Sequence, residues 1–135
     1  MKNIIFLSII LCSILLINNS CKKANQAPEI TVDEPAINQV YNISLIGTEV
    51  HIEGTATDDE GLHSGFLSII RNSDSAVMFS YELPSVHDTK SYDFHEHYEP
   101  IDSTIIGNTP MKVYVKFEDH EDLLTTKVID ISVNP

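Results

Sequence analysis

From Glu29 onward, the dominant feature of the chain is that apolar and polar residues alternate with a period of two. The alternation is clearest over residues 50–56, 111–117 and 129–133. A period of two places alternate side chains on one face of a β-strand, whereas a helix requires apolar residues three or four positions apart. Helical spacing is nearly absent from this part of the chain. The pattern therefore predicts an all-β domain in which most strands bury one face.

Turn-forming residues divide the alternating segments into separate strands. Asp58–Gly61 and Asn72–Ser75 are rich in residues that favour turns, and Pro84 ends another run. Residues 64–71 carry apolar side chains on both faces, which is typical of a central strand. About seven strands without an intervening helix favour an immunoglobulin-like antiparallel β-sandwich. The predicted strands cover residues 29–33, 48–58, 64–71, 77–83, 91–98, 111–117 and 129–133.

The formal net charge of the chain is −12, and basic residues are few. Nucleic-acid binding needs clustered Lys and Arg side chains that neutralise phosphates. Because the basic residues of the predicted domain are spread along the sequence, we expect no nucleic-acid partner. The acidic surface has two interpretations, which are the maintenance of solubility and the attraction of cations. The basic residues concerned are Arg71, Lys90, Lys112, Lys116 and Lys127.

The first twenty residues have the layout of a secretory signal peptide. Lys2 precedes a mostly apolar run over residues 4–17, and Ser20 provides a small residue at the predicted cleavage site. A retained membrane helix is the alternative, but the run is shorter than the roughly 20 residues that cross a bilayer. Neither of the two cysteines, Cys12 and Cys21, lies in the predicted domain, so we expect no disulfide and no cysteine zinc site within it.

The dipeptide Ser20-Cys21 resembles the bacterial lipobox, and the polar stretch after it is similar to the tether of lipoproteins of the Bacteroidetes type. That resemblance implies that Cys21 receives diacylglycerol and anchors the protein to the outer membrane of the cell envelope. Because Lys22 and Lys23 do not form the acidic signal linked to surface export, a periplasm-facing location is favoured. The expected organisation is a lipoprotein signal peptide over residues 1–20, a lipidated cysteine and polar tether over residues 21–28, and a β-sandwich domain over residues 29–135.

Two segments resemble the turn signatures of bacterial immunoglobulin-like envelope modules. Ala56–Leu62 and Val113–Asp119 each contain the end of a strand and acidic residues at a turn. Together with the leader and residues 92–97, they make the chain similar to the lipoprotein group called domain-of-unknown-function family 4625. The resemblance covers most of the chain after Pro28 and implies a fold more than an activity. The acidic loop at residues 119–122 departs from the Gly-Asn turn that is usual in such modules.

Residues 92–98 carry the sharpest local signal for metal chemistry. On a strand, Asp93, His95 and His97 project together from the face opposite to the core. Two neutral imidazoles on one face provide part of a zinc, copper or nickel site, which needs about four ligands. Asp93, Glu99 and His87 are the candidates for a further ligand. The alternative interpretation is an ordinary polar strand face with exposed histidines.

Acidic residues form a second candidate site, which would suit calcium. In an immunoglobulin-like topology, the loops that follow residues 48–58 and 111–117 lie at the same end of the sandwich. Calcium prefers six to eight oxygen ligands. Neither loop has the ligand spacing of a calcium-loop motif, so turn capping and solvation are the alternative. The candidate calcium ligands are Asp58, Asp59, Asp119, Glu121 and Asp122.

Catalytic motifs are missing from the sequence. The chain has no Gly-x-Ser-x-Gly motif, no cysteine in the predicted domain and no glycine-rich phosphate loop. We therefore expect no enzyme, and no cofactor other than a divalent metal. The favoured function is a non-enzymatic binding or accessory module that recognises a protein or a glycan through its loops or a sheet edge. The alternative is a divalent-metal-binding envelope protein that uses His95 and His97, or the acidic loops.

We predict that Cys21→Ala prevents fatty-acid labelling of the protein and releases it from the membrane fraction. The physical reason is that Cys21 supplies the thiol to which the lipid is joined, and the acyl chains hold the protein at the bilayer. Metabolic labelling and membrane fractionation measure the two effects, with Cys12→Ala as the matched control. A labelled, membrane-retained Cys21→Ala protein would contradict the lipoprotein interpretation.

Overall fold

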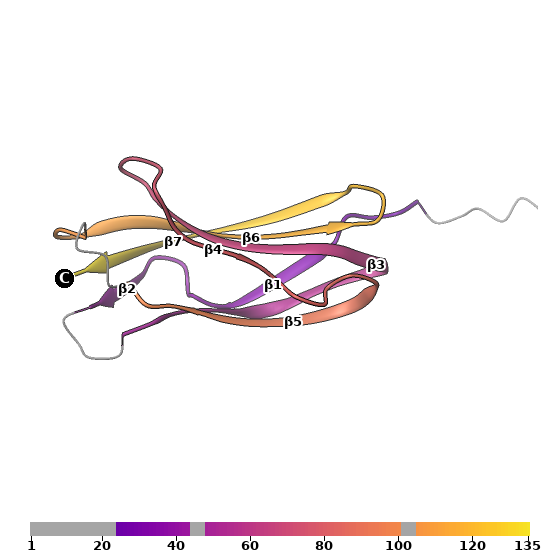
Figure 1. Ribbon diagram of the computed structural model, residues 1–135, viewed down its shortest axis with the longest axis horizontal. Helices are drawn as coiled ribbons and strands as arrows, with labels where there is room; N and C mark the ends of the chain where they lie inside the picture. The colour runs from indigo at the N-terminus through magenta and orange to yellow at the C-terminus, as the bar shows by residue number, and fades with distance from the viewer. Residues whose placement is uncertain (1–23, 44–47, 101–104) are drawn as a thin grey trace, which may run out of the picture.

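The computed structural model describes residues 24–43, 48–100 and 105–135, which form seven β-strands (Figure 1). The predicted signal peptide and Cys21 lie outside the described residues. No helix in the described part of the chain is long and apolar enough to cross a membrane. The strands are β1 (Glu29–Glu34), β2 (Gln39–Asn42), β3 (Val50–Arg71), β4 (Val77–Glu82), β5 (Thr89–Tyr98), β6 (Thr109–Asp119) and β7 (Leu124–Asn134).

The strands pack as two layers that share the long strand β3 (Figure 1). The first half of β3 pairs with β1 and β5, and its second half pairs with β4 and β6. Strand β7 continues the second layer beside β6, and β2 joins the outer side of β7. All of these pairs are antiparallel except β2 with β7, which is parallel. This arrangement is the immunoglobulin-like β-sandwich that the sequence predicts.

Strand β3 passes from one layer to the other where the sequence predicts a turn. At Asp58–Gly61 the chain stays extended, but the pairing with β5 breaks between Thr57 and Leu62. The Asp58 carboxylate accepts hydrogen bonds from the backbone N–H groups of Glu60 (2.9 Å) and Gly61 (2.7 Å). Gly61 has a φ of 121°, which is accessible to glycine and strained for other residues. The predicted turn is therefore a bend within one strand, and the prediction of two separate strands is wrong.

The core lies between the two layers and follows the predicted alternation. In β6, Met111, Val113, Val115 and Phe117 are fully buried, while the residues between them are partly exposed. The ring of Phe94, on β5 in the first layer, packs against Phe117 in the second, with ring centroids 5.7 Å apart. A difference from the expectation is β2, a strand of four residues that pairs in parallel and has too short a pattern to be recognised.

Gly54 permits the close approach of β1 to β3. A methyl group at this position would collide with the backbone oxygen of Thr31, and it would lie 2.8 Å from Cζ of Phe94 and 3.0 Å from Cα of Val32.

We predict that Gly54→Ala lowers the free energy of unfolding by about 3 kcal/mol, because the backbone oxygen cannot move without breaking the β1–β3 ladder. Urea unfolding measures the change, with the exposed position Thr57→Ala as control. An unchanged stability of the Gly54→Ala protein would show that β1 does not approach β3 this closely at Gly54.

Candidate metal centres

The six histidines of the chain gather in two groups of three. The sequence contains six histidines. Within each group, the candidate ligand atoms lie within 4.8 Å of one another. In the described part of the chain, no other set of three or more histidine, cysteine or acidic side chains meets that condition. We call His51, His95 and His97 the sheet cluster, and His63, His87 and His120 the loop cluster.

The sheet cluster lies on the outer face of the β3–β5 ladder. His51 is directly opposite His97, and Glu53 is opposite His95. Val50 and Ile52, which flank His51 in the chain, are fully buried, so the alternation of the strand turns the His51 side chain to the solvent. His95 and His97 project to the same side, as the sequence predicts. The pairing of β5 with β3 therefore adds a third imidazole to the two that lie on one strand.

The three imidazoles of the sheet cluster are close enough to share one ion. The ring centroid of His97 lies 4.4 Å from that of His51 and 4.6 Å from that of His95. Nε2 of His95 lies 3.5 Å from Nδ1 of His51. Two nitrogens that bind the same tetrahedral zinc ion at about 2.0–2.1 Å are roughly 3.3 Å apart. The separation of these two nitrogens is therefore close to that of a shared metal ion.

Two carboxylates border the sheet cluster. The Glu49 carboxylate lies 3.1 Å from Nδ1 of His97 and 3.9 Å from Nε2 of His51. The Glu53 carboxylate lies 4.0 Å from Nε2 of His95. Anionic groups beside the imidazoles make the surface attractive to a cation. All five side chains are partly exposed, so an ion can reach them from solvent.

Asp93, the candidate ligand named with His95 and His97, lies outside the sheet cluster. Its carboxylate accepts a hydrogen bond of 2.8 Å from the hydroxyl of Thr55, which is opposite Asp93 on β3. His51 cannot be recognised as a ligand from the sequence, because the register between β3 and β5 decides which residue faces His97. Period-two spacing identifies the outward face of His51, but not its partner.

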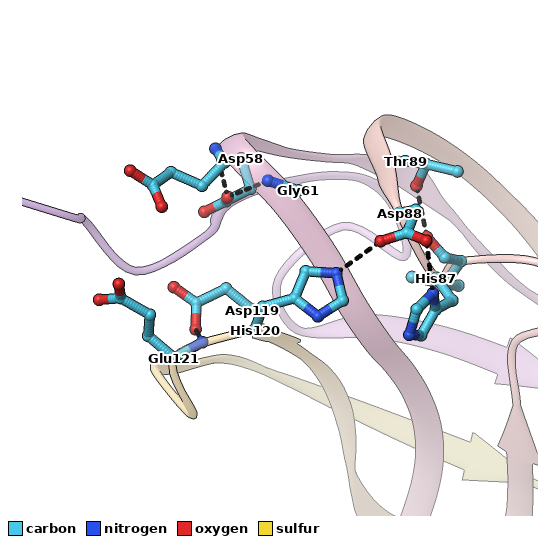
Figure 2. Close-up of polar contacts among 10 residues, drawn as sticks. Asp58, Gly61, His87, Asp88, Thr89, Asp119, His120 and Glu121 are labelled. Carbon is cyan, nitrogen blue, oxygen red and sulfur yellow. Dashed lines mark hydrogen bonds and ion pairs between the residues drawn. The ribbon is translucent and has the colours of Figure 1, made fainter.

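Two carboxylates of the acidic loops, those of Asp58 and Asp119, cap their own turns (Figure 2). Asp119 is fully buried, and its Oδ1 accepts the backbone N–H groups of Glu121 and Leu123, each at 2.8 Å. Its Oδ2 accepts a hydrogen bond of 2.7 Å from the side chain of Asn25. Asp58 caps the bend of β3 in the same way. Both carboxylate oxygens of Asp119 and Oδ1 of Asp58 therefore accept hydrogen bonds from the protein. The candidate calcium ligands Asp58, Asp59, Asp119, Glu121 and Asp122 contribute no set of three that meets the 4.8 Å condition in the described part of the chain.

Burial opposes ionisation of Asp119, but the hydrogen bonds from Leu123, Glu121 and Asn25 outweigh it and lower its pKa below 3.8. Because the pKa of Asp119 is lower in the folded protein than in the unfolded chain, its carboxylate stabilises the fold at pH values above the unfolded pKa. This stability is lost as the pH falls through the folded pKa.

We predict that Asp119→Ala lowers the free energy of unfolding by about 3 kcal/mol at neutral pH. Asp119→Asn, which keeps an oxygen acceptor, should lose less.

Urea unfolding at a series of pH values checks this prediction. The wild-type protein should lose stability as the pH falls below 3.8, and the Asp119→Asn protein should lose less over the same range. Equal pH dependence of the two proteins would contradict the role given to the Asp119 carboxylate.

Comparisons with known proteins give a fold likeness and no family. No protein-family model matches the chain, and no curated protein matches it. Among solved structures, the chain is similar to the CARDB domain of a protein from Pyrococcus furiosus, which was crystallised in complex with di-metal ions. The TM-score is 0.47 at 15% sequence identity, and the match covers 86% of this chain and 97% of that one. A likeness at this level says nothing about the chemistry of the present chain.

Proposed function

We propose that the protein is a non-enzymatic binding module of the cell envelope, anchored through Cys21, whose ligand is a transition-metal ion held by the sheet cluster. The observation that carries the proposal is the convergence of His51, His95 and His97 on one exposed face. Neutral imidazole is a good ligand for zinc, copper and nickel. The lipid anchor and the envelope location rest on the sequence of the leader alone.

The two carboxylates would have different roles in this site. Glu49 faces Nδ1 of His97 and Nε2 of His51, which leaves the other nitrogen of each ring for the metal. A carboxylate in that position orients the rings and raises their basicity without binding the ion. Glu53 faces Nε2 of His95, the nitrogen that also approaches His51. Glu53 would therefore complete a site of three nitrogens and one oxygen, which suits tetrahedral zinc.

The position of the sheet cluster on paired strands favours metal binding over the alternative that these histidines only form a polar strand face. His51 and His97 are opposite each other across the ladder, so their separation is fixed by backbone hydrogen bonds and not by loop conformation. Sites built on strands hold their ligands more accurately than sites on loops, which reduces the ordering that binding requires. Acid should release the metal, because protons compete with it for the imidazole nitrogens.

We predict that His51→Ala weakens zinc binding at the sheet cluster by about 100-fold or more, because it removes a ligand and leaves only two imidazoles and one carboxylate. Asp93→Asn is the matched control, since Asp93 lies on the same face but bonds to Thr55. Glu53→Gln should weaken binding more than Glu49→Gln does, because only Glu53 is assigned as a ligand. Calorimetric titration of the full chain with zinc, repeated with copper and nickel, measures these affinities.

Two results would contradict the proposal. One is equal zinc affinity of the wild-type and His51→Ala proteins at this site. The other is a loss of affinity in the Asp93→Asn protein as large as that in the His51→Ala protein, which would favour a ligand set built on β5 alone.

A further inference from the structure

The loop cluster brings together three segments that are far apart in the sequence. His63 follows the bend of β3, His87 lies in the connection between β4 and β5, and His120 lies in the turn between β6 and β7. The ring centroid of His63 lies 5.1 Å from that of His87 and 5.1 Å from that of His120. The centroids of His87 and His120 are 4.8 Å apart. All three side chains are exposed. Three neutral imidazoles at these separations are a set of ligands for one ion.

Backbone contacts fix the three segments around one residue, Leu62. The N–H of Asp88, next to His87, donates a hydrogen bond of 2.9 Å to the carbonyl of Leu62. Asp119, next to His120, is the strand partner of Leu62 in the β3–β6 ladder. Leu62 itself is fully buried and precedes His63. Each histidine of the loop cluster is therefore next to a residue whose backbone is anchored, so the fold places the imidazoles together before any ion binds.

Asp88 orients two of the three imidazoles (Figure 2). Its Oδ1 lies 2.9 Å from Nε2 of His120, and its Oδ2 lies 3.0 Å from Nδ1 of His87. If these nitrogens carry the protons, Nδ1 of His120 and Nε2 of His87 are free to bind a metal. A carboxylate that accepts the outer N–H of a ligating histidine is the usual partner in histidine metal sites.

We propose that the loop cluster is a second transition-metal site, in which His63, His87 and His120 are the ligands and Asp88 positions two of them. Three nitrogen ligands leave one position of a tetrahedral ion for solvent. His63 and His87 also line a surface cavity of about 450 Å³, and all three histidines are exposed to solvent. The residues of this site are distinct from those of the sheet cluster, so the proposal does not depend on the first site.

The same chain supplies matched controls for the two sites. His51→Ala with His97→Ala removes the sheet cluster, and His63→Ala with His120→Ala removes the loop cluster. Because all six histidines belong to the two clusters, no other histidine can bind the probe. None of the exchanged side chains is buried, so the variants should keep the fold, which far-ultraviolet circular dichroism checks.

The experiment measures zinc bound per full chain at equilibrium, in the presence of a competing chelator of micromolar affinity. The chain without the sheet cluster should bind one zinc ion, and the additional loss of His63 and His120 should abolish binding. Asp88→Asn in the chain without the sheet cluster should weaken the remaining site by about 10- to 100-fold.

Zinc binding that disappears when only the sheet cluster is removed would overturn the second site and leave the first intact. Equal zinc content of the wild-type chain and the chain without the loop cluster would also overturn it. If instead the sheet cluster binds no zinc, the wild-type chain and the chain without the sheet cluster should have equal zinc content.

Discussion

The passage of strand β3 from one layer to the other is the constraint on which the rest of the structure depends. This strand pairs with β1, β4, β5 and β6, and it changes partners at a bend that the Asp58 carboxylate and Gly61 stabilise. A strand without such a bend would hold both halves in one layer and would leave their apolar faces uncovered. The bend instead closes the sandwich over the core, in which Phe94 of one layer meets Phe117 of the other.

The same strand positions both histidine clusters. His51 lies at the start of β3, where the ladder with β5 sets it opposite His97. His63 lies just past the bend, where β3 begins to pair with β6 and where the β4–β5 connection is hydrogen-bonded to Leu62. The sheet cluster is therefore built on a regular ladder, and the loop cluster on three connections at the bend. The geometry of the sheet cluster is therefore fixed by one ladder, whereas the loop cluster joins three separate segments of the chain.

The sequence predicts the fold better than it predicts the sites, for a physical reason. Period-two alternation is a local signal, so the strand faces, the core of β6 and β7 and the outward face of His95 and His97 can be recognised from it. Registers between strands are set by long-range pairing, so the third ligand His51 cannot be recognised. The Asp58–Gly61 signature predicts a turn, whereas the structure has a bend within one strand, because local chemistry does not tell whether the chain reverses there or continues as a strand.

The loop cluster illustrates the same limit more strongly, since its members come from three connections and no spacing in the sequence joins them. Anomalous diffraction at the zinc absorption edge, from crystals of the full chain grown with zinc, tests the presence of two sites most directly. Two separate zinc sites predict two peaks, one between His51, His95 and His97 and one between His63, His87 and His120. An anomalous map without a peak at either cluster, or with zinc bound only to carboxylates elsewhere, would contradict the assignment of the histidines to metal binding.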